Sequence, residues 1–196
     1  MRSAKVLTVF LILSAIMFYF GGCSSAEQTT AKLAYAQGDY KKAEEEFLKE
    51  TNQNPANEEA WFYLAMSRAQ LSKAEGVREA MSRYTAIGKF TFKSELTEAW
   101  GTMYDRAYKQ YEDGEKSAKS GKDDEAVKKF TEALNNFEIA FALLPDSAFV
   151  KENIAALNGR INTILVKPTI DKDVELEKNG DFAGATFRLH LARHPL

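Results

Sequence analysis

The chain has 196 residues, of which 45% are hydrophobic and 28% are charged, with a formal net charge of −2. These values are typical of one globular domain and argue against a disordered chain. The slightly negative charge, without a basic stripe, argues against nucleic-acid binding, and the single cysteine excludes an internal disulfide or a thiolate metal cluster.

Residues 1–22 have the pattern of a secretory signal peptide. Arg2 and Lys5 precede an apolar run over 6–20, and small residues follow it. A charged start, an apolar middle and a small-residue exit are typical of export signals. The run is shorter than the roughly 20 residues that a spanning helix needs. We therefore expect residues 1–22 to take no part in the fold.

The residues around Cys23, FGGCSS, resemble the lipobox of bacterial lipoproteins, in which the cysteine is acylated and becomes the mature N-terminus. Phe20 departs from the aliphatic residue that is usual there. The resemblance implies a lipid anchor at Cys23 with a short tether over 23–29. Ser24 after the cysteine then favours the outer membrane, with the domain facing the periplasm. Two alternatives remain: cleavage after Ala26, which gives a secreted periplasmic protein, or an uncleaved inner-membrane anchor.

Helix-favouring residues dominate the domain that follows, residues 30–196. Alanine, glutamate, lysine and leucine recur, and the alternation of a strand is absent apart from KFTF at 89–92. Glycines and prolines mark the stops between helices. The sequence therefore predicts an all-α domain, with helices over 27–37, 40–53, 57–73, 77–87, 95–120, 123–144, 147–166, 170–179 and 182–193.

One phrase recurs in this domain, at 38–47, 121–130 and 180–189. Each copy begins with glycine, and alanine and a large apolar residue follow, four positions apart. The glycine ends one helix in the left-handed conformation, and Asp39 can cap the next. Ala43 and Phe47 then share one face of that helix. The phrase predicts helical hairpins that pack closely.

The phrase resembles part of the tetratricopeptide repeat, a helix–turn–helix unit of about 34 residues. The match stays in register over residues 30–72 and becomes irregular beyond them. It rests on Gly38, Tyr40, Ala43, Phe47, Pro55, Trp61, Leu64 and Ala65. The resemblance implies an α-solenoid of antiparallel helical hairpins with degenerate repeats, which binds peptides in a concave groove.

The same resemblance assigns candidate partner-binding residues. In the helix over 57–73, the stripe that contains Trp61 packs inside, and the opposite stripe faces the groove. That second stripe consists of Glu59, Phe62, Met66, Ala69 and Gln70. In the helix over 95–120, Trp100 takes the packing role, which leaves Asp105, Tyr108 and Glu112 toward the groove. The alternative is that irregular neighbouring helices cover both stripes.

No catalytic motif is present, so we expect neither an enzyme nor a cofactor. His190 and His194, four residues apart, could hold a metal, but a basic helix end explains them more simply. The sequence predicts an envelope lipoprotein that acts as a scaffold or adaptor for other envelope proteins or peptides. The alternative function is a receptor for a small molecule or glycan, with Tyr104, Tyr108 and Tyr111 in a groove.

Overall fold

The computed structural model describes residues 25–178, with the side chains of residues 25–166 and of Glu175. This part of the chain is helical throughout apart from short connections, and it contains no strand. The predicted all-α class is confirmed. The predicted signal peptide, Cys23 and the predicted last helix over 182–193 lie outside the described residues. The helices are α2 (Ala26–Ala36), α3 (Tyr40–Gln53), α4 (Glu58–Gln70), α5 (Ala74–Ile87), α6 (Lys93–Lys119), α7 (Asp123–Leu143) and α8 (Ala148–Lys178).

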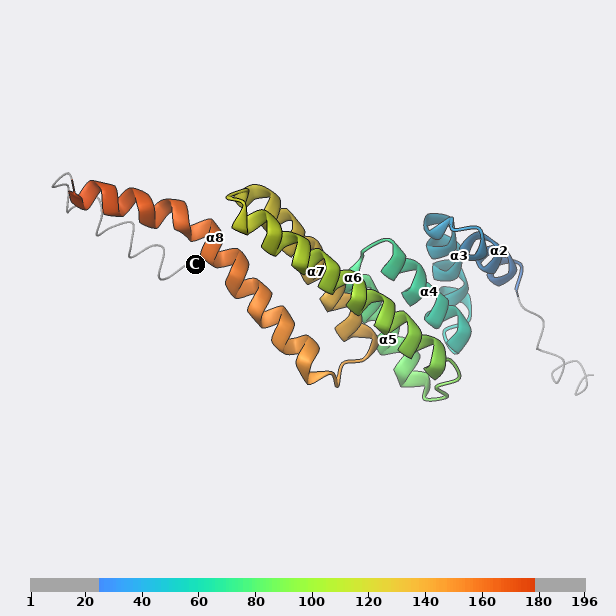
Figure 1. The fold of residues 1–196 in the computed structure, drawn as a ribbon. Helices are drawn as coiled ribbons and strands as arrows, with labels where there is room; N and C mark the ends of the chain where they lie inside the picture. The colour runs from blue at the N-terminus through green and yellow to red at the C-terminus, as the bar shows by residue number, and fades with distance from the viewer. Residues whose placement is uncertain (1–24, 179–196) are drawn as a thin grey trace, which may run out of the picture.

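Consecutive helices pack as hairpins: α2 with α3, α4 with α5, and α6 with α7. The hairpins follow one another along an elongated molecule, so that α2 and α8 lie at opposite ends (Figure 1). The second hairpin contacts the first through α4 and α3, and α8 packs on α7. The third hairpin contacts the second through α7, which packs on α5. Within residues 25–178, no helix is both long and apolar enough to cross a membrane.

The connection between α2 and α3 has the local structure that the repeated phrase predicts. Gly38 has a φ of +77°, in the left-handed region, where a side chain would be strained. The Asp39 carboxylate accepts a hydrogen bond from the backbone N–H of Lys42 and so caps α3. Ala43 and Phe47 are fully buried. These local predictions are confirmed.

Two predicted helix boundaries are wrong. Gly76 was expected to precede a helix, but α5 already begins at Ala74. A Cβ atom at Gly76 would lie 2.9 Å from Cδ of Arg68. The glycine in α5 therefore leaves room for the Arg68 side chain to pack against this helix. Pro168 was expected to separate two helices, but α8 continues to Lys178. A proline removes one backbone donor, and α8 is continuous across it.

A cluster of polar side chains joins the start of α2 to the connection between α3 and α4. Glu50 is 1% exposed and accepts hydrogen bonds from the hydroxyl of Ser25 and from the amides of Asn54 and Asn57. Asn57 also donates to Gln28, and its own oxygen caps α4. The N-terminal end of the described chain is thus held against the first hairpin.

Candidate functional site

The predicted groove face of α4 is covered by the chain itself. Phe62, Met66 and Ala69 are 3%, 5% and 1% exposed, respectively. The ring of Phe92 stacks on that of Phe62, with 4.5 Å between their centroids and 11° between their planes. The prediction that Phe62, Met66 and Ala69 lie open in a groove is therefore wrong.

The connection between α5 and α6 explains why this face is closed. The buried carboxylate of Glu58 accepts hydrogen bonds from both the backbone N–H and the hydroxyl of Thr91, at 3.0 and 2.7 Å. The backbone N–H of Phe92 donates to the hydroxyl of Tyr84. These contacts hold Phe92 over α4. In the sequence, the aromatic residues of KFTF, at 89–92, were the sign that this connection packs on the domain, since a connection in solvent does not need aromatic side chains.

The polar members of the same predicted set are partly buried at the sides of α4. Glu59 pairs with Lys32 at 2.7 Å and accepts a hydrogen bond from the amide of Gln28 at 2.5 Å, so it connects α4 to α2. Gln70, at the end of α4, is half-buried. Neither residue borders a cleft with Phe62 or Met66.

The second predicted set lies on the surface of α6. Asp105, Tyr108 and Glu112 are exposed, and they line a shallow hollow of about 370 Å³ together with Tyr104 and Lys109. The spacing of three and four residues places them on one side of the helix. The structure thus brings this set together at the surface, and its role in binding stays a prediction.

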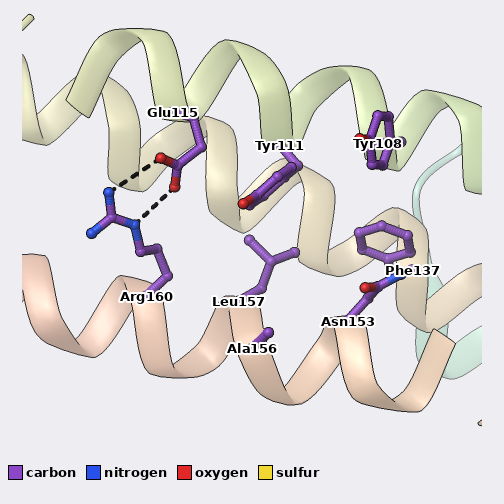
Figure 2. Close-up of a pocket in the computed structure, with 8 residues that line it drawn as sticks. All are labelled: Tyr108, Tyr111, Glu115, Phe137, Asn153, Ala156, Leu157 and Arg160. Carbon is purple, nitrogen blue, oxygen red and sulfur yellow. Dashed lines mark hydrogen bonds and ion pairs between the residues drawn. The ribbon is translucent and has the colours of Figure 1, made fainter. Parts of the chain in front are cut away.

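A deeper cleft of about 480 Å³ lies between α6, α7 and α8. In Figure 2, side chains from α6 and α8 face each other across it, and Phe137 of α7 lies between the two helices. Tyr108 borders both this cleft and the shallow hollow. The cleft is lined by Tyr108, Tyr111, Glu115, Phe137, Asn153, Ala156, Leu157 and Arg160.

Helical spacing places these side chains on facing stripes. The residues from α6 follow one another at intervals of three and four, and Asn153, Leu157 and Arg160 of α8 do the same, with Ala156 beside Leu157. Leu157 is buried against the core, whereas Ala156 is exposed and too short to reach α6. Phe137 is 2% exposed and closes the floor. The α8 side of the cleft was not predicted, because Asn153, Ala156 and Arg160 form no recognisable motif in the sequence.

An ion pair closes one end of the cleft. The guanidinium of Arg160 donates to both carboxylate oxygens of Glu115, at 2.8 and 3.3 Å, as Figure 2 shows. This hydrogen-bonded pairing lowers the pKa of Glu115 and raises that of Arg160, against the opposing effect of burial. The guanidinium also lies 6.0 Å from the centroid of the Phe130 ring. The pair fixes α8 relative to α6.

The side chains that line this cleft are of kinds that can contact a ligand. Aromatic faces, one amide and one closed ion pair offer contact area and a few polar groups. No group of three or more His, Cys, Asp or Glu side chains that could hold a metal occurs among the residues that the structure describes. The predicted alternative metal pair, His190 and His194, lies outside the described residues.

Comparison with known proteins adds no assignment: no protein-family model matches the chain, and no curated protein matches it either. What the molecule does must therefore follow from its geometry. A hollow of about 660 Å³ beside Trp61 is larger but more open than the cleft between α6 and α8, which is the more enclosed of the two.

Proposed function

We propose that the protein is an envelope lipoprotein that acts as a scaffold, binding other envelope proteins or peptides through the cleft between α6 and α8. The observation that carries this proposal is the cleft itself. It combines two tyrosine rings from α6 with an amide, two aliphatic side chains and an arginine from α8 in a hollow of about 480 Å³, within the range of roughly 300–1,000 Å³ typical of binding pockets. Partly exposed aromatic rings in a concave surface are typical of sites that bind partners.

The burial pattern supports a relationship to tetratricopeptide repeats. The positions that the resemblance assigns to packing between helices are buried, including Ala43, Phe47, Trp61, Leu64 and Ala65. Three successive hairpins followed by one more helix also suit a short array of such repeats. The contact between the first two hairpins, in which α4 packs on α3, follows this stacking, whereas the third hairpin departs from it and packs on α5 through α7.

The proposed anchor would orient the molecule on the bilayer. Cys23 precedes Ser25 by two residues, a reach of at most about 7–8 Å. Ser25 is fixed to Glu50 and caps α2. An acylated Cys23 would therefore hold the α2 end of the molecule close to the lipid headgroups. The helix α8, which forms one side of the cleft, lies at the opposite end of the molecule (Figure 1), so the cleft would face partners in the periplasm.

The anchor is tested by fractionation of cells that make Cys23→Ser. We expect the wild-type protein in the outer-membrane fraction and the variant in the soluble periplasmic fraction, because acyl chains provide about 0.8 kcal/mol of membrane affinity per buried methylene. Ser24→Ala is the matched control and should stay in the membrane. An unchanged distribution of Cys23→Ser would rule out lipidation as the anchor.

The scaffold role is tested by crosslinking and affinity purification from solubilised membranes with three proteins. Ala156→Phe places a ring in the cleft, and Ala155→Phe places the same ring one position away on the same helix, outside the cleft; both alanines are exposed. We expect a partner that the wild type and Ala155→Phe retain and that Ala156→Phe loses. If no partner depends on position 156, the cleft is not the binding surface.

A glycan is the second candidate ligand, and the tyrosines favour it. The rings of Tyr108 and Tyr111 beside the amide of Asn153 offer flat apolar faces next to a hydrogen-bonding group. Such a site would be stabilised by soluble cell-wall fragments or oligosaccharides. A rise in melting temperature with these ligands, absent in Ala156→Phe, would favour this function over the scaffold.

A further inference from the structure

Four aromatic side chains form a row along one side of α6. Trp100 and Tyr104 stack with 5.5 Å between ring centroids, and Tyr104 and Tyr108 with 6.4 Å, both at an interplanar angle of 18°. Tyr111 continues the row, 6.1 Å from Tyr108 and tilted by 44°. Spacings of three and four residues keep the four rings on one face of the helix. The row is a continuous aromatic surface that faces α8.

The chain covers the first half of this row with an aromatic ring of its own. Phe149, near the start of α8, makes edge-to-face contacts with Trp100 and Tyr104, at centroid distances of 5.7 and 5.4 Å. This is the geometry in which the positive edge of one ring meets the negative face of another. The structure thus shows what kind of side chain the row accepts.

The second half of the row receives no ring from the described part of α8, although Tyr111 contacts the ring of Phe130 of α7, with 5.9 Å between centroids. Further along α8, Leu157 points toward Tyr111, and the other short lining residues, Asn153 and Ala156, carry no ring as Phe149 does. Tyr108 is consequently 48% exposed. The cleft of Figure 2 is therefore the place where α8 provides no ring for Tyr108 and Tyr111.

The hollow on the other side of Tyr108 has a different character. Asp105 and Glu112 are exposed, flank Tyr108 along α6, and make no ion pair within the described residues. Lys109 lies in the same hollow but is not within salt-bridge distance of either carboxylate. Two carboxylates against one ammonium group leave the hollow negative. A positively charged side chain would be complementary to it.

From these two adjoining surfaces, we propose that the cleft binds a partner segment in which an aromatic residue lies close to a lysine or arginine. The aromatic ring enters the cleft beside Tyr108 and Tyr111, as Phe149 does beside Trp100 and Tyr104. The cationic side chain passes Tyr108 and reaches Asp105 and Glu112. This inference rests on the proposed scaffold function and names the chemistry of the partner.

The test uses the full-length protein in detergent micelles and fluorescently labelled synthetic peptides. Each probe peptide has one phenylalanine and one lysine in a glycine–serine background, separated by zero, one or two residues. Control peptides replace phenylalanine by alanine, or lysine by glutamate. Binding is measured by fluorescence anisotropy. We expect saturable binding of at least one phenylalanine–lysine peptide, weakened about tenfold when the ring is removed, an ordinary effect for a buried aromatic anchor.

Protein variants separate the two surfaces. Ala156→Phe should weaken binding about tenfold, whereas Ala155→Phe should leave it unchanged. Tyr108→Ala serves as a second variant of the cleft, because Tyr108 is half-exposed and its loss spares the core. Asp105→Lys/Glu112→Lys should reverse the charge preference and favour the peptide with glutamate. The matched control, Glu45→Lys/Glu98→Lys, changes two exposed glutamates elsewhere and should keep the preference for lysine.

The outcomes separate this inference from the proposed function. If a membrane partner depends on position 156 but no phenylalanine–lysine peptide binds, the scaffold function stands and the inference is wrong. If the peptides bind equally well with lysine and with glutamate, the assignment of the acidic hollow is overturned. If oligosaccharides bind the cleft and the peptides do not, both proposals are replaced by the glycan function.

Discussion

Gly114 of α6 lies directly against the ring of Phe130 of α7. A Cβ atom at Gly114 would be 2.6 Å from both Cδ1 and Cε1 of this ring, which is closer than any stable contact. Phe130 is fully buried and is held in place by the packing of α6 on α7. The Phe130 ring occupies the space that a side chain at position 114 would fill. The repeated phrase that places Phe130 at its tenth position therefore depends on a glycine in the neighbouring helix.

Gly114→Ala should destabilise the protein, although alanine favours a helix by about 1 kcal/mol over glycine. The added methyl group must displace a buried ring, and overpacking of this kind costs about 1–3 kcal/mol. Gly101→Ala is the matched control, because it lies in the same helix with nothing within 4 Å of the added atom. It should stabilise the protein by up to about 1 kcal/mol. Urea denaturation gives both values, and stabilisation by both substitutions would show that α6 and α7 are not so close.

The two tryptophans should respond differently to replacement by phenylalanine. The indole N–H of Trp61 donates to the carbonyl of Pro55 at 2.9 Å, whereas that of Trp100 is buried and has no partner within the described residues. Removing a donor that is already unsatisfied relieves a desolvation cost, and removing a satisfied one loses about 0.5–1.5 kcal/mol. We expect Trp61→Phe to be the more destabilising by about 1 kcal/mol in thermal or urea unfolding. The reverse order would mean that Trp100 has a hydrogen-bond partner.

The first two hairpins show how much of the fold can be predicted from the sequence. Helix propensity and a local phrase place Gly38, Asp39, Ala43 and Phe47 correctly, because each of these features acts within one or two turns. The class of fold follows from the same local signals. Gly76 shows the limit of this approach. It has the sequence appearance of a helix break, but its role is to admit the side chain of Arg68 from α4, which no local pattern reveals.

The candidate site could be predicted only in part, for a related reason. Asp105, Tyr108 and Glu112 form a surface within one helix, so their spacing is sufficient to group them. Phe62 was misassigned because a distant connection, held by Glu58, places Phe92 over it, and Met66 is likewise buried. The cleft depends on which residues of α8 oppose α6. That pairing is tertiary, and it follows from the packing of α8 on α7.

The pH dependence of stability should depend on Glu50. Burial alone would raise its pKa, but hydrogen bonds from Ser25, Asn57 and Asn54 outweigh burial and hold the pKa below its ordinary value of 4.5. A carboxyl whose pKa is lower in the folded state contributes stability above the unfolded value, and this contribution is lost as the pH falls through the folded value. The wild type should therefore lose stability as the pH falls below about 4.5.

Glu50→Gln tests this assignment. The amide cannot accept all three hydrogen bonds, so the variant should be less stable than the wild type at pH 7 by about 1–3 kcal/mol. The difference should shrink as the pH falls, because the wild-type carboxyl becomes protonated. Glu45→Gln is the control at an exposed position of the same helix and should be nearly neutral. A difference between Glu50→Gln and wild type that is the same at pH 7 and pH 3 would contradict the role of the charge.

The ion pair at the end of the cleft should be visible in the titration of Glu115. Its pKa is lowered chiefly by the hydrogen bonds from Arg160, with smaller contributions from the charges of Arg160 and Lys119 and an opposing effect of burial. In Arg160→Gln, we expect the pKa of Glu115 to rise toward 4.5, its ordinary value, as measured by NMR of the side-chain carboxyl. Arg106→Gln, an exposed change on the same helix as Glu115, should leave that pKa in place.

Because the Arg160 side chain is 40% exposed, solvent screens the pair, and its coupling in a double-mutant cycle with Glu115→Gln should be only about 0.3–1 kcal/mol. Equal pKa values in wild type and Arg160→Gln would mean that α8 does not close this end of the cleft in solution.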